Sequence, residues 1–164
     1  MQSTKSKYFQ DYMPTNVCFG CGTTNEQGLQ IKSYWEGEEA VCHWKPEEHH
    51  HGWPNVLCGG ILATLIDCHT MNTAMAHAYR LEERDLDTLP NYKYATGSMN
   101  IKYLKPTSNN DVVELRARVT EVKRRKTVVW CEAFSNGIKT AEAEVVAIRV
   151  YDSSQVKAGN AFGG

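Results

Sequence analysis

A single carboxylate lies within the most apolar stretch of the chain. The run Val56–Tyr79 reads VLCGGILATLIDCHTMNTAMAHAY, and Asp67 is its only acidic residue. An Asp is almost never fully buried unless it is paired or functional, because an ionised carboxylate loses its hydration there. Perturbed carboxylates also concentrate at functional sites. Asp67 is therefore either a buried structural anion or a catalytic group that the segment presents to a substrate, and we favour the catalytic interpretation.

A glycine pair opens the same segment. Gly59 and Gly60 let another group approach the backbone closely. The first N–H groups of a helix have no intrahelical partner and lie at the positive end of its dipole, so they suit a developing oxyanion. Gly60 and Asp67 lie roughly 10 Å apart along a helix that rises 1.5 Å per residue. One helix cannot offer both groups to one carbonyl, whereas two antiparallel copies can. The spacing predicts a composite site in a homodimer.

A histidine and two cysteines that could also take part in catalysis or metal binding are expected to have structural roles. His69 is two positions from Asp67 and points to another side of the helix, so we expect a hydrogen-bonded packing histidine. Cys18 and Cys21 have the spacing of half a zinc site, but a complete site needs two more ligands. We favour a glycine-rich turn with buried thiols, and expect neither a bound metal nor a cofactor.

Length and composition limit the function classes. A chain of 164 residues predicts one domain with a sizeable core. A net charge of −1 argues against a nucleic-acid binder. The mean hydropathy of −0.49, with polar residues inside the apolar run, argues against a membrane span. Six cysteines without an apolar leader at the start of the sequence indicate reduced thiols, and we expect a cytoplasmic protein.

The hydrophobic pattern predicts one long helix and six strands. The helix opens at Gly59-Gly60, runs through the apolar stretch and ends at the charged segment Arg80–Asn91. The expected strands are Leu29–Trp35, Glu39–Lys45, Tyr94–Leu104, Val112–Val122, Thr127–Phe134 and Lys139–Tyr151. A helix that is apolar on most sides must be wrapped, and a curved antiparallel sheet can wrap it. We expect an α+β fold with a polar N-terminal segment (1–17), one domain (18–152) and a flexible tail (153–164).

The order of motifs resembles that of the hotdog-fold acyl-CoA thioesterases, most of all the phenylacetate-degradation branch. The motifs are CxxCG and NxxGL within 18–29, CGGILATLID over 58–67 and TGSMNIKYLKPT over 96–107. The resemblance covers about Cys18–Tyr151 and implies the hotdog fold, a curved antiparallel β-sheet wrapped around one long central helix. It also implies hydrolysis of an acyl-CoA or acyl-carrier-protein thioester by a homodimer or homotetramer.

The resemblance also implies roles for individual residues. Asp67 would act as the general base on water, or alternatively as a nucleophile, and Thr96 would help to position the water. The N–H groups of Gly59 and Gly60 would polarise the thioester carbonyl. The chain departs from the family pattern at Cys58, where the family has a histidine before the glycine pair. Cysteine is a poorer hydrogen-bond donor than histidine, so the oxyanion would depend more on the backbone.

Several substrate-binding assignments stay open at this point. Cys58 is expected to contact substrate, with a nucleophilic role as the alternative. His50 or His51 can replace the missing imidazole, or both are surface loop residues. Arg124 and Lys126, in the basic run KRRK, either form a solvated turn or contact the phosphates of coenzyme A.

Two other functions compete with hydrolysis. A non-catalytic protein that binds or senses acyl thioesters would keep the same pocket, and Cys58 in place of the family histidine favours it. A hotdog hydratase or dehydratase would need a catalytic histidine paired with an acid, and the nearest histidine, His69, points away from Asp67.

Overall fold

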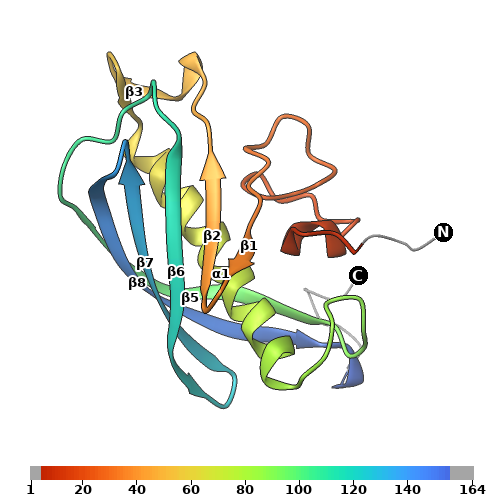
Figure 1. Ribbon diagram of the computed structural model, residues 1–164. Coiled ribbons are helices and arrows are strands. Elements are labelled where there is room, and N and C mark those ends of the chain that lie inside the picture. The colour runs from red at the N-terminus through yellow and green to blue at the C-terminus, as the bar shows by residue number, and fades with distance from the viewer. Residues whose placement is uncertain (1–4, 156–164) are drawn as a thin grey trace.

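A six-stranded antiparallel sheet curves around one long helix, α1 (Gly59–Leu81) (Figure 1). The computed structural model of the chain describes residues 5–155. The strand order is β1-β2-β6-β7-β8-β5, so β1 and β5 are the edges of the sheet. The strands are β1 (Tyr34–Glu36), β2 (Glu39–Trp44), β5 (Tyr92–Tyr103), β6 (Val113–Lys123), β7 (Lys126–Ser135) and β8 (Ile138–Asp152). This arrangement confirms the predicted hotdog fold.

The helix forms where the sequence predicts it, and it fills the concave side of the sheet. Cys58 is its N-cap, and three large aliphatic side chains in its first half are almost fully buried: Leu62, Leu65 and Ile66 are at most 2% exposed. The helix packs against β5, β6, β7 and β8. It ends at the charged segment that follows Leu81. Within residues 5–155, no helix is both long and apolar enough to cross a membrane.

Two segments differ from their predicted structure. Of the expected strand Leu29–Trp35, only the end is extended; Gln30 has a φ of 54°, which interrupts the strand. Ile31 is nevertheless buried. The segment 47–57, for which the hydrophobic pattern predicts no helix or strand of its own, contains a short 3₁₀ helix (Glu48–His50) and a small hairpin of β3 (His51–Trp53) and β4 (Val56–Leu57).

The N-terminal segment packs on the domain. Residues Phe9–Tyr12 form a 3₁₀ helix, and Phe9 is only 2% exposed. The buried Gln10 accepts a hydrogen bond from the Ser33 N–H (2.7 Å) and donates one to the Ser33 hydroxyl (3.1 Å). At the other end, Ser153–Gln155 form a last 3₁₀ helix. The rest of the expected tail, 156–164, and residues 1–4 lie outside the described part of the chain.

Candidate active site

A cavity of about 680 Å³ lies between α1, the start of β5 and the N-terminal segment. Its apolar wall includes Met71 and Met75 from the helix and Tyr94 from β5. Asp67 and Thr96 also line it. Pockets that bind small molecules combine an apolar lining with a few polar groups in this way, at volumes of about 300–1,000 Å³. The cavity is therefore the candidate site for a substrate.

The structure brings Asp67 and Thr96 together. The Thr96 hydroxyl donates a hydrogen bond to Asp67 Oδ1, which joins the middle of α1 to the edge strand β5. Asp67 is half-buried, and Thr96 is exposed in the single chain. This hydrogen bond uses one of the acceptor sites of the carboxylate, which has others on both of its oxygens. This pair, far apart in sequence, has the geometry of a carboxylate base with a neighbouring hydroxyl.

Gly59, Gly60 and Cys58 lie at the N-terminus of α1. Tyr103, near the end of β5, donates a hydrogen bond to the Gly59 carbonyl (2.8 Å). The Cys58 N–H donates to the His50 carbonyl (2.9 Å), which ties the helix start to the preceding loop. The lining of the cavity with Asp67 does not include these three residues in the described part of one chain. The two predicted halves of the site thus occupy different positions along the helix.

The structure places His50 and His51 outside that cavity, as far as residues 5–155 define it. His50 is 7% exposed, its ring lies 4.9 Å from the ring of Trp44, and its Nδ1 accepts a hydrogen bond from the Glu47 N–H (2.8 Å). Burial lowers the pKa of His50. His51 is exposed at the start of β3. Within one chain, neither histidine joins Asp67.

The basic residues Arg124 and Lys126 lie at the turn between β6 and β7. Arg124 has a φ of 56°, which is typical of a tight turn. Lys126 pairs with Ile148 of β8, and Ile148 pairs with Ala95 of β5. The basic turn is thus two strands, roughly 10 Å, from the residue that precedes Thr96. Positive charge therefore lies on the same end of the sheet as the Asp67–Thr96 pair.

His69 is a packing residue, as predicted. It is fully buried, its Nδ1 lies 2.8 Å from the Ser33 hydroxyl, and its Nε2 lies 3.0 Å from the Ala40 carbonyl. A carbonyl only accepts, so Nε2 carries the hydrogen and Nδ1 accepts from Ser33. Burial lowers the pKa of His69 to about 4 despite the bond to Ala40. The neutral ring connects α1 to β2 and to the segment before β1.

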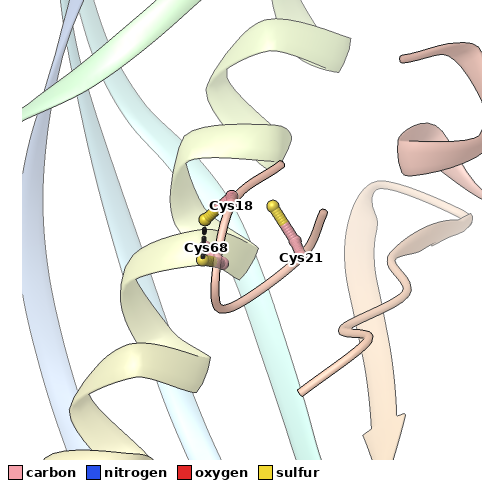
Figure 2. A group of neighbouring side chains, drawn as sticks. All are labelled: Cys18, Cys21 and Cys68. Atoms are coloured by element: carbon pink, nitrogen blue, oxygen red, sulfur yellow. Dashed lines mark hydrogen bonds between the residues drawn. The ribbon is translucent and has the colours of Figure 1, made fainter. Parts of the chain in front are cut away.

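The structure contains a cluster of three cysteines that the sequence analysis did not predict. In it, Cys68 of α1 lies next to Cys18 and Cys21 (Figure 2). All three sulfurs lie within 4.8 Å of one another. Hydrogen bonds from the Cys21 and Cys68 thiols lower the pKa of the Cys18 thiol below its usual value. The sequence gives no signal for the contact of Cys68 with the CxxC segment, because that contact depends on tertiary structure.

Comparison with known proteins identifies the family. Residues 55–142, which include Asp67 and Thr96, match the model of the thioesterase superfamily. A thioesterase superfamily protein of Shewanella loihica is 33% identical, with 74% of this chain and 91% of that one covered and a TM-score of 0.61. Among curated proteins, none matches.

Two more distant solved structures share the fold. One is a hypothetical thioesterase of Streptococcus pneumoniae with coenzyme A (16% identity, 71% and 85% of the chains, TM-score 0.58). The other is the Escherichia coli PaaI protein from the phenylacetic acid degradation operon (15% identity, 76% and 82%, TM-score 0.61). The family model, which covers more than half of the chain, and the Shewanella relative lead to one conclusion: this chain belongs to the thioesterase superfamily.

Proposed function

We propose that the protein is an acyl-CoA thioesterase in which Asp67 is the general base. The hydrogen bond between Thr96 and Asp67, at the wall of a cavity large enough for an acyl group, is the observation that carries the proposal. The coenzyme A in the pneumococcal structure with the same fold supports a CoA thioester as the substrate class. The PaaI neighbour and the aromatic lining near Tyr94 support an arylacetyl group as the first acyl group to test.

In the proposed reaction, water adds to the thioester carbonyl. Asp67 Oδ2 takes a proton from the water as the water oxygen bonds to the carbonyl carbon. The Thr96 hydroxyl, whose hydrogen is donated to Asp67 Oδ1, accepts the second hydrogen of that water and orients it. The N–H groups of Gly59 and Gly60 stabilise the oxyanion that forms. When the tetrahedral intermediate collapses, the C–S bond breaks, and the proton on Asp67 passes to the departing thiolate.

The proposed site is shared between two protomers. Gly60 and Asp67 are roughly 10 Å apart along one helix, whereas a reacting carbonyl must lie about 3 Å from both groups. β5, which carries Thr96, is an edge strand of the described sheet, and Met99 and Tyr103 on it are 37% and 54% exposed. An edge strand with exposed apolar side chains is a template for pairing with another strand. Pairing of two β5 strands would bring a second α1 alongside the first.

A panel of thioesters tests the proposal. Release of free thiol is measured for acetyl-CoA, arylacetyl-CoA, long-chain acyl-CoA and an acyl-carrier-protein thioester, with Asp67→Asn as the control. We expect turnover of at least one CoA thioester and its loss in Asp67→Asn. Equal turnover in both proteins would exclude Asp67 as the base.

One observation favours a second candidate, a non-catalytic binder of acyl thioesters. Cys58 stands at the N-cap of α1 without a side-chain cap hydrogen bond, where the family resemblance predicts a histidine. The same panel separates the two functions, since a binder would show saturable acyl-CoA affinity by calorimetry and no release of thiol. The Asp67→Asn variant would then bind as tightly as the native protein without a difference in turnover.

A further inference from the structure

We propose that Cys18, Cys21 and Cys68 bind one zinc ion, with a fourth position open to the cavity. The three sulfurs all lie within 4.8 Å of one another, and those of Cys18 and Cys68 are 3.7 Å apart (Figure 2). Zinc binds thiolates at about 2.3 Å in a tetrahedral arrangement, which places neighbouring sulfurs about 3.8 Å apart. The Cys18–Cys68 pair therefore has the sulfur spacing of a zinc site, and the other two pairs are at most 4.8 Å apart.

The backbone is shaped to bring these sulfurs together. A Cβ on Gly20 would lie 2.2 Å from Cys68 Sγ, and a Cβ on Gly22 would lie 2.5 Å from backbone atoms of Cys18. Both positions therefore need glycine. The Gly22 N–H donates to the Cys18 carbonyl (2.8 Å), and the Ile31 N–H donates to the Gly20 carbonyl (3.0 Å). The CFGCG loop is thus folded tightly and held against α1.

Two amides contact the sulfur of Cys21 in a way that suits a thiolate. Asn16 Nδ2 lies 3.5 Å from Cys21 Sγ, and Asn72 Nδ2 lies 3.6 Å from the same sulfur. Asn72 also donates to the Cys68 carbonyl (2.7 Å), which fixes its orientation. Hydrogen bonds from an outer shell of this kind orient metal ligands and stabilise their charge.

The fourth coordination position of the ion would face the cavity. All three cysteines line the cavity that also contains Asp67 and Thr96. Zinc sites with three protein ligands keep a position for water or an added ligand. The ion would fasten the N-terminal segment to the helix turn that carries Asp67, and so would shape one wall of the cavity. The proposal does not depend on thioesterase activity, since its measurements concern metal and thiols.

Metal analysis of the full chain tests this inference. The protein is produced without a histidine tag and purified without chelator, and its zinc is measured by mass spectrometry. We expect about one zinc per chain. Replacement by Co²⁺ should give a sulfur-to-cobalt charge-transfer band and visible bands of tetrahedral cobalt. Cys21→Ser and Cys68→Ser should lower zinc affinity at least 10- to 100-fold in competition with a chelating dye, as the loss of even outer-shell partners does.

A matched control and a second measurement keep the test decisive. Cys42→Ala removes a buried thiol from β2 and should leave the zinc content unchanged. In the unmodified protein, zinc should protect Cys18, Cys21 and Cys68 from alkylation, as read by peptide mapping, so the result does not depend on a variant folding. A metal-free protein with three free thiols, a disulfide within the cluster, or zinc that persists in both serine variants (as on the His49–His51 loop) would overturn the proposal.

Discussion

Asp67 is the residue on which the proposed chemistry depends. Asn keeps the size of the side chain and an oxygen that can accept the Thr96 hydrogen bond, but it cannot take a proton from water. We therefore expect Asp67→Asn to lower kcat by about 10²–10⁴-fold, the usual contribution of a general base, with little change in the melting temperature. Steady-state release of thiol from the best substrate of the panel measures this.

The control for Asp67→Asn is Asp87→Asn. Asp87 is exposed in the loop between α1 and β5, so its amide variant changes the net charge equally without touching the cavity. We expect native turnover for it. A loss of activity in both variants would point to net charge rather than to the position of Asp67.

At the residue scale, the sequence predicted some contacts and missed others. Asp67 and Thr96 could be paired because two motifs, each with its own spacing, carry them. Thr96 was identified from the family resemblance, and Asp67 was identified as the only acidic residue in an apolar stretch. The contact of Cys68 with Cys18 could not be predicted, since half a zinc motif does not say which distant residue completes it. Its glycines, Gly20 and Gly22, signalled a tight turn but not the helix that the turn packs against.

The segment just before β1 connects the N-terminal 3₁₀ helix to α1. The Ser33 hydroxyl bonds both Gln10 of the N-terminal 3₁₀ helix and His69 of α1, and all three residues are fully buried. Ser33→Ala would leave the buried amide of Gln10 and the ring of His69 each without one partner. We expect it to lower the free energy of unfolding by about 1–3 kcal/mol, measured by urea denaturation. Ser154→Ala, at an exposed position of the last 3₁₀ helix, should change it by less than about 0.5 kcal/mol.

The basic turn between β6 and β7 gives a prediction about substrate affinity. Arg124→Ala with Lys126→Ala should raise KM for an acyl-CoA several-fold, because the phosphates of the nucleotide lose cationic partners. The matching acyl-pantetheine thioester, which lacks the nucleotide, should keep its KM. Lys45→Ala with Lys105→Ala, which follow β2 and β5 at the opposite end of the sheet, removes the same charge and is the control. An equal change for both substrates would assign the turn to stability rather than to phosphate binding.

The regular elements were predictable because their signals are local. The helix ends where the charged segment begins, and alternating side chains with turn residues predict β6, β7 and β8 to within about two residues. The predictions failed where a tertiary contact determines the local structure. Ile31 is buried in a loop because its N–H bonds the CFGCG segment, and Phe9 is buried although its neighbours are polar. A polar segment in sequence can thus still supply part of the core.

At the scale of the whole molecule, the single chain holds only part of the proposed machinery. Asp67 and Thr96 line the cavity of the described chain, whereas Gly59 begins the helix at a different place. The site is completed either by the partner protomer or within the same chain, and a dimer of two different variants distinguishes these two arrangements. If each site takes its base from one protomer and its oxyanion donors from the other, two different defects in two chains leave one site of the dimer intact.

Gly59→Pro supplies the second defect. Proline is favoured at the first helical position, where it removes an N–H without breaking the helix. The preceding residue, Cys58, has φ −56° and ψ 128°, the backbone conformation that a residue before proline adopts. We expect Gly59→Pro to fold and to lose about 10²–10³-fold in kcat, as measured for loss of one oxyanion donor.

The decisive experiment co-expresses Asp67→Asn and Gly59→Pro chains with different tags and isolates the mixed dimer by sequential affinity purification. One site of that dimer combines both defects, and the other combines the native Asp67 of one chain with the native helix N-terminus of its partner. A shared site therefore predicts about half of the native activity per dimer, far above either variant alone. If each chain completed its own site, every site in the mixed dimer would keep one defect, and its activity would equal the mean of the two inactive variants.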